Sequence, residues 1–154
     1  MTSDNRIPNP EDLLSELAEC WQAIRLGADI AEVASVEASI REFGQRYLDR
    51  VFLPAEVASC SVDGRPDPAR LAARFAAKEA VIKALDLTER GTSWREIEVR
   101  RSGSGRCYIR LHGSLVREQK FDQSLGFPVT LSHDGAYAIA IVAFPEAPCS
   151  GPAS

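Results

Sequence analysis

An alanine-rich segment that begins at Asp67-Pro68 is the feature that most constrains how this chain can fold. Asp67 can cap the first turn of a helix, and Pro68 suits the first helical position, where its missing N–H costs no hydrogen bond. The residues that follow are mostly alanine, leucine and long charged side chains, which favour helices. The sequence therefore predicts a long helix over 68–86, against which the rest of the chain has to pack.

Alternating apolar and polar residues predict strands before and after this helix. Residues 23–30 alternate in this way, which is typical of a half-buried strand, here one that ends near Asp29. Further strands are predicted at 97–101, 107–111, 129–132 and 137–144. The last of them is apolar on both faces, so we expect it to lie deep in the core. Residues 133–136 contain an Asp-Gly pair and predict a hairpin between the last two strands.

The remaining apolar periodicity predicts shorter helices and two terminal segments. The predicted helices cover 33–50, a short stretch from Pro54, and 114–121. Residues 11–21 are predicted to form a short amphipathic helix that follows a flexible lead. We therefore divide the chain into an N-terminal extension with a short helix, one domain and a flexible tail, at 1–22, 23–145 and 146–154.

Length and composition argue against several classes of function. The chain has 154 residues, about the size of one domain, and its formal net charge of -4 gives no support for a nucleic-acid or anionic-membrane surface. No apolar run approaches the roughly 20 residues of a membrane helix. The N-terminus also lacks a secretory signal, so we expect a cytosolic protein that does not bind membranes. The 4 cysteines form no C-x-x-C pair, and a zinc site is not expected.

The long helix carries the first group of candidate functional residues. Phe75, Glu79 and Lys83 lie four residues apart and follow one another along a single face. With Arg74 on a neighbouring stripe, this face could hold a metal through Glu79 and phosphate oxygens through Lys83 and Arg74. Taken alone, the pattern is more simply explained by a Glu–Lys pair that stabilises the helix by about 0.2–0.5 kcal/mol.

Two further candidates lie on or beside the predicted strands. Asp29 is a carboxylate among apolar neighbours, and together with Glu79 it could bind Mg²⁺, which prefers one or two carboxylates plus waters and phosphate oxygens. For Asp29 alone, capping of the next helix is the simpler role. His133 at the hairpin tip could donate to a phosphate or transfer a proton, or it could be an ordinary turn residue. Neither a P-loop nor a G-x-G-x-x-G motif is present, which argues against nucleoside triphosphatases and dinucleotide-binding folds.

Five blocks of sequence, taken in order, resemble the holo-acyl-carrier-protein synthase family of phosphopantetheinyl transferases. The strongest block is Arg74-Phe75-Ala76-Ala77-Lys78-Glu79-Ala80-Val81-Ile82-Lys83-Ala84, which is similar to the family's signature helix almost letter for letter. The other blocks are 27–30, 50–56, 94–99 and 131–135. Together they span about 23–145, and their number and order make the resemblance specific.

This resemblance implies a compact α+β fold, with antiparallel strands packed against the long helix, and usually a homotrimer with active sites between subunits. It implies that Asp29 and Glu79 are Mg²⁺ ligands and that Lys83 protonates or stabilises the leaving group. The residues implied in holding coenzyme A are Arg74, Phe75, Lys83 and His133. The implied reaction is attack by a serine of an acyl carrier protein on the β-phosphate of coenzyme A, which releases adenosine 3',5'-bisphosphate. Glu79, directly or through a metal-bound water, is the candidate base.

The chain departs from the family pattern in its first long helix, in a loop and at its N-terminus. The family's first helix is usually basic, to bind the acidic carrier, whereas here Ser35 stands where an arginine is usual, and Glu37 and Glu42 add negative charge. Like charges across an interface can reject a partner. The glycine-rich loop expected after the signature helix keeps only Gly91, and residues 1–22 have no counterpart in the minimal pattern.

Three functions are therefore considered from the sequence. The leading one is an active transferase that serves a carrier of a fatty-acid or polyketide pathway. The alternatives are a non-catalytic binding or assembly module that keeps the fold, and an enzyme with another reaction in the same pocket. The joint presence of Asp29, Glu79, Lys83 and His133 favours catalysis, whereas the acidic first helix favours the non-catalytic module.

Overall fold

A computed structural model describes residues 24–121 and 124–146 of the chain. The predicted helix over 11–21 and residues 147–154 of the predicted tail lie outside these ranges. The helices are α2 (Val33–Phe43), α3 (Gln45–Val51), α4 (Pro54–Ser59), α5 (Pro68–Ala84), the short 3₁₀ helix η1 (Trp94–Glu96) and α6 (Gly113–Gln119). The strands are β1 (Ile24–Glu32), β2 (Ser61–Val62), β3 (Arg65–Pro66), β4 (Ile97–Arg101), β5 (Cys107–Leu111), β6 (Phe127–Asp134) and β7 (Tyr137–Pro145).

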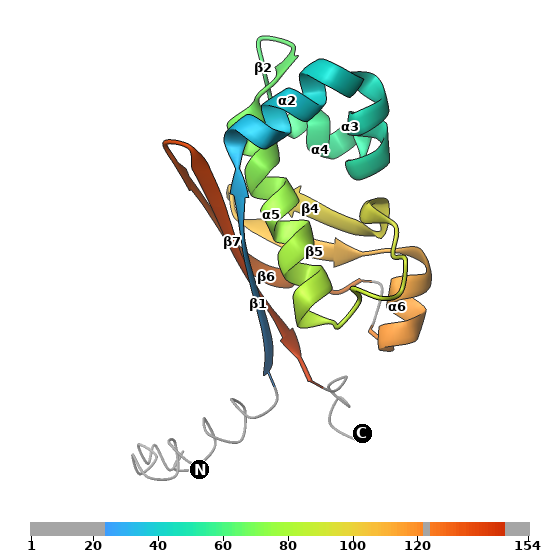
Figure 1. Cartoon of the computed structure of the whole chain (residues 1–154). Coiled ribbons are helices and arrows are strands. Elements are labelled where there is room, and N and C mark those ends of the chain that lie inside the picture. Colours follow the sequence, from blue (N-terminus) through green and yellow to red (C-terminus); the bar gives the residue numbers. More distant parts are fainter. Residues whose placement is uncertain (1–23, 122–123, 147–154) are drawn as a thin grey trace, which may run out of the picture.

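The architecture is a main antiparallel sheet with α5 packed across one of its faces, and a separate small sheet formed by β2 and β3 (Figure 1). The main sheet has 5 strands in the order β1-β7-β6-β5-β4, so the first and last long strands of the domain pair directly. The helices α2, α3 and α4 gather at one end of α5, and α6 lies near its other end (Figure 1). This arrangement confirms the predicted α+β fold class. Over the described ranges, no helix is long and apolar enough to cross a membrane.

Local sequence explains where α5 begins and how closely it approaches the sheet. Oδ1 of Asp67 accepts hydrogen bonds from the backbone N–H groups of Ala69 and Arg70, at 2.9 and 3.3 Å, as an N-cap does. A Cβ atom added at Gly27 of β1 would lie 2.0 Å from the carbonyl oxygen of Ala80. Only glycine therefore permits this contact between β1 and α5. Because most of the buried residues of α5 are alanines, the helix backbone lies close to the strands and is buried on nearly all sides.

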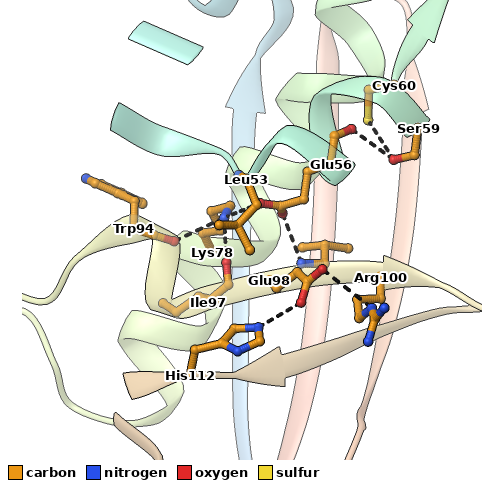
Figure 2. A network of polar contacts seen from close by, with 11 residues as sticks. Leu53, Glu56, Ser59, Cys60, Lys78, Trp94, Ile97, Glu98, Arg100 and His112 are labelled. Atoms are coloured by element: carbon orange, nitrogen blue, oxygen red, sulfur yellow. Dashed lines mark hydrogen bonds and ion pairs between the residues drawn. The ribbon is translucent and has the colours of Figure 1, made fainter. Parts of the chain in front are cut away.

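A buried ion pair joins α5 to segments on both sides of it in the sequence (Figure 2). The side chains of Lys78 and Glu56 are 0% and 1% exposed, and Lys78 Nζ lies 2.9 Å from Glu56 Oε2. Lys78 also donates to the carbonyl oxygens of Trp94 and Ile97, and Glu56 accepts from the backbone N–H of Val99 at 2.9 Å. The network therefore fixes α5 against α4, η1 and β4 at the residue that precedes Glu79 in the chain.

Two predicted boundaries were wrong, each for a local reason. The predicted helix over 33–50 is interrupted at Gly44, whose φ of +55° and ψ of -132° are not helical. It therefore forms the two helices α2 and α3. The predicted hairpin over 133–136 has a tighter turn, made by Gly135 and Ala136 alone. His133 consequently lies in β6, paired with Ala138 of β7, and not at the tip.

The prediction that the last strand is buried on both faces was also wrong. In β7 every second residue faces α5 and is buried, whereas the intervening Tyr137, Ile139 and Ile141 are 53%, 43% and 47% exposed. β1 continues to Glu32 and does not end near Asp29, and its buried residues Gly27 and Ala31 lie on the side opposite to Leu26. Leu26 is 69% exposed. We call this surface the apolar sheet face; its residues are Ile24, Leu26, Ile30, Tyr137, Ile139 and Ile141.

Candidate active site

Three of the predicted site residues come together where β1 passes α5. Asp29 lies on the same side of β1 as the buried Gly27, and its side chain is 14% exposed. Glu79 and Lys83 lie on the partly exposed side of α5, and Nζ of Lys83 donates to Oδ1 of Asp29. Lys83 is itself 54% exposed, so its ammonium group is also accessible to a ligand. The arrangement is a pair of carboxylates and one cation beside an open surface.

The electrostatics of this group favour an additional cation. Burial and the nearby charge of Asp29 raise the pKa of Glu79, and Lys83 opposes this increase only in part. The hydrogen bond to Asp29 and the charge of Asp29 raise the pKa of Lys83, which therefore keeps its proton at neutral pH. Two neighbouring carboxylates repel each other, and a divalent cation would relieve that repulsion.

The donor set fits Mg²⁺ better than a metal that needs a complete protein cage. Among residues 24–121 and 124–146, no group of 3 or more His, Cys, Asp or Glu side chains could hold a metal ion. Asp29 and Glu79 are therefore the candidate protein ligands that the described part of one chain brings together. Mg²⁺ is commonly bound by one or two carboxylates, with waters and substrate phosphates as its other ligands.

Arg74 and His133 lie together in a second place, a hollow of about 220 Å³ that we call the arginine hollow. Arg70 and Arg101 also line it, and its lining contains no carboxylate. Arg74 is only 7% exposed, and its Nε has no hydrogen-bond partner in the part of the chain that the structure describes. A buried guanidinium with an unpaired donor, surrounded by other cations, is suited to bind a phosphate.

Phe75 lies in a third place, a groove of about 520 Å³ between α5, η1 and the helices α2 and α3. Its ring stacks on Trp94, with the ring centroids 5.1 Å apart. We call this cavity the aromatic groove; its main lining residues are Phe43, Arg46, Tyr47, Arg50, Phe75 and Trp94. Phe75 and Glu79 are one turn apart on α5, so the aromatic groove adjoins the carboxylate pair.

Sequence patterns identified some of these residues and missed others. The spacing along α5 correctly grouped Glu79 with Lys83, but it did not separate them from Arg74 and Phe75, which lie in different cavities. Trp94 was recognised only as part of a resembling block. Its single signal was an aromatic residue three positions before a predicted strand, which is too common to predict a groove.

Comparison with known proteins shows the family to which the chain belongs. The model of the 4'-phosphopantetheinyl transferase superfamily matches residues 25–142. The chain belongs to this superfamily. The resemblance found in the sequence blocks is thereby confirmed, and the match to this transferase begins at residue 25.

Relatives of this transferase are named for one activity. The holo-[acyl-carrier-protein] synthase of Moorella thermoacetica is 46% identical over 121 residues, which are 77% of this chain and 91% of that protein. The Helicobacter pylori synthase, solved in complex with coenzyme A, has a TM-score of 0.66 and 27% identity, and the match covers 76% of this chain and 96% of that one. The Neisseria meningitidis synthase has a TM-score of 0.64 and 28% identity, covering 77% of this chain and 94% of that one.

Proposed function

We propose that this chain is a holo-[acyl-carrier-protein] synthase. It transfers 4'-phosphopantetheine from coenzyme A to a serine of an acyl carrier protein, depends on Mg²⁺ and releases adenosine 3',5'-bisphosphate. The observation that carries the proposal is the group formed by Asp29, Glu79 and Lys83 in a chain of the transferase superfamily. The activity for which the 46% identical relative is named supports it.

Each residue of this group has a role that follows from its surroundings. Asp29 and Glu79 would hold Mg²⁺, which when bound offsets the negative charge of pyrophosphate oxygens. Lys83 is protonated at neutral pH as any ordinary lysine is, and the hydrogen bond to Asp29 raises its pKa further, so it stabilises charge on the departing nucleotide and does not act as a base. The raised pKa of Glu79 makes this carboxylate a better proton acceptor than an ordinary glutamate, so it is our candidate base for the carrier serine. The serine oxygen forms the new bond to phosphorus as the bond to the nucleotide breaks.

The arginine hollow and the aromatic groove would hold the two substrates. Arg74 and His133, with Arg70 and Arg101 beside them, bind a phosphate of coenzyme A, which supplies the partner that the buried Nε of Arg74 lacks. Phe75 lies in the aromatic groove next to Glu79, where the carrier and the pantetheine arm have to meet. Coenzyme A and an acyl carrier protein are therefore the proposed partners.

We infer that the functional unit is a homotrimer with active sites between subunits. The apolar sheet face supports this assembly, because several neighbouring apolar side chains that are 43–69% exposed are typical of a surface covered by a protein partner. Arg74 and His133 line the arginine hollow, whereas Asp29 and Glu79 lie at another place in the subunit. This separation also supports the assembly, because two subunits could then complete one site. A neighbouring subunit can bring its arginine hollow next to the carboxylate pair of the first subunit.

Replacing Leu26 by aspartate is expected to dissociate the trimer, because it places a charge in the centre of an apolar interface. Light scattering after size-exclusion chromatography would give the mass of a monomer, and transfer activity would fall with it. The control is Val62→Asp on the β2 strand, an equally apolar residue that is 44% exposed. This variant should keep the wild-type mass. A Leu26→Asp variant with the wild-type mass would show that the apolar sheet face is not the interface.

The cellular setting is part of the same proposal. A cytosolic protein that modifies carriers of fatty-acid or polyketide synthesis is supported by the free thiols of Cys60 and Cys107.

A second candidate function is a non-catalytic module that keeps the fold. The acidic character of α2, which carries Glu37 and Glu42, is the observation that favours it.

Intact-mass spectrometry separates the two functions. Apo carrier proteins are incubated with this protein, coenzyme A and Mg²⁺, and the mass of each carrier is followed. The transferase predicts a gain of one phosphopantetheine group that disappears when a chelator is added. A protein that binds coenzyme A and modifies no carrier would be the non-catalytic module.

A further inference from the structure

Cys107 lies in the arginine hollow and has no part in the proposed reaction. It is the first residue of β5 and pairs with Arg101 of β4. Because side chains alternate along a strand, Cys107 lies on the same side of the sheet as Ile109 and Leu111, which are buried in the core. Its thiol is free and its side chain is only partly buried. Cys107 therefore lies where the core opens into the hollow.

The surroundings of this thiol are positively charged. The other ionisable residues that line the hollow come from three elements, and they are Arg70, Arg74, Arg101 and His133. Asp67 pairs with Arg70 at 3.5 Å. Arg74 is 7% exposed, and its buried Nε has no hydrogen-bond partner within residues 24–121 and 124–146. This unpaired donor favours an anion in the hollow, and the same anion would lie beside the thiol of Cys107.

A second cavity gives a reagent room to reach the same thiol. Cys107 also lines a larger groove of about 770 Å³, which is formed mainly by residues of β5 and β6. The pairing of these strands consists of Tyr108 with Pro128 and Ile109 with Phe127, so it ends one residue before Cys107 is reached. A molecule that enters this groove can therefore bring a sulfur atom to Cys107 while its charged group occupies the hollow.

The other thiol of the described residues is protected. Cys60 is 0% exposed, and burial raises the pKa of its thiol, so it keeps its proton. Reactive cysteines are typically partly exposed and surrounded by cations, and in the described ranges only Cys107 meets both conditions.

We propose that Cys107 is a site of reversible modification by small anionic disulfides, and that this modification prevents coenzyme A from binding. The inference rests on the proposed function, in which the arginine hollow holds a phosphate of coenzyme A. The sulfur of Cys107 attacks one sulfur of the disulfide, and the new S–S bond forms as the old one breaks. The second sulfur leaves as a thiol and takes the proton that Cys107 gave up. The anionic group of the half that stays attached occupies the phosphate position beside Arg74.

The first measurement follows the mixed disulfide at Cys107 by peptide mass spectrometry. Two reagents with the same reacting group are compared, the anionic dithiodipropionate and the neutral bis(hydroxyethyl) disulfide. The ratio of their rates, anionic to neutral, should be roughly tenfold higher with the folded protein than with the protein unfolded in urea, because positive surroundings concentrate the anion. Added salt should reduce this difference. Adenosine 3',5'-bisphosphate, which carries phosphates but no thiol, should protect Cys107 from both reagents.

The second measurement is the binding of adenosine 3',5'-bisphosphate, followed by calorimetry before and after treatment with dithiodipropionate. The treated wild-type protein should bind roughly tenfold more weakly or worse, and a reductant should restore its affinity. The matched control is Cys107→Ser, which lacks the reacting sulfur. Its affinity should be the same before and after treatment, which excludes an effect of modification at any other cysteine.

Two results would overturn the inference alone, provided that the untreated protein transfers phosphopantetheine to a carrier. One is a rate ratio that is the same for the folded and the unfolded protein. The other is a protein that is modified at Cys107 and binds the bisphosphate as tightly as before. An untreated protein that neither binds the bisphosphate nor modifies a carrier would overturn the proposed function, and this inference with it.

Discussion

Glu79→Gln is expected to reduce Mg²⁺-dependent phosphopantetheine transfer by about a hundredfold to a thousandfold while leaving the fold intact. The amide has nearly the shape of the carboxylate, but it carries no charge to bind a metal and is too weak a base to take the serine proton. Stability should not fall, because burial and Asp29 raise the pKa of Glu79 in the folded protein. Its charge at neutral pH therefore opposes folding, and a neutral residue removes that cost.

The measurement is the rate at which an apo carrier gains mass, together with the thermal unfolding of each variant. Glu89→Gln is the control, since Glu89 is an exposed residue beyond the end of α5 and the substitution makes the same chemical change. It should leave both the rate and the melting temperature unchanged. A Glu79→Gln variant with a near-normal rate would show that the metal is bound elsewhere.

Lys78→Met is expected to lower the free energy of unfolding by about 3–5 kcal/mol, because it leaves the charge of Glu56 buried without a partner. Two backbone carbonyls, those of Trp94 and Ile97, also lose their donor. Burial lowers the pKa of Lys78, and the charge of Glu56, with a smaller contribution from Glu98, opposes this, which is expected of a buried ammonium group that depends on nearby carboxylates. Urea denaturation measures the loss, which corresponds to about 10 °C in Tm.

Two further variants show whether the loss comes from the unpaired charge. Lys83→Met removes a lysine from the same helix, but its side chain is 54% exposed, so stability should change little while transfer slows. Combining Lys78→Met with Glu56→Gln should restore part of the stability, because the amide oxygen is neutral and still accepts from the backbone. If Lys78→Met proves as stable as the wild type, the buried pair contributes nothing to folding.

Sequence reasoning predicted well the elements that depend on interactions between neighbouring residues. The Asp67-Pro68 start of α5 and the strands β4 and β5 were placed correctly, because capping and alternation act over a few neighbouring residues. Gly44 was missed since an apolar stripe continues through it, and a stripe does not report the dihedral angles of one residue. The exposed face of β7 was misplaced, because its exposed residues are as apolar as core residues and the sequence pattern does not distinguish the two.

Two lysines of α5, Lys78 and Lys83, show which properties the sequence by itself determined and which only the tertiary structure decided. The motif that contains Lys78 and Lys83, together with four other blocks in the same order, was sufficient to identify the transferase superfamily and the candidate metal ligand Glu79. It could not show that one lysine is a buried structural ion and the other an exposed site residue. Their partners, Glu56 and Asp29, lie 22 and 54 residues away in the chain. Burial and pairing depend on which distant segments meet, and only the folded chain brings those segments together.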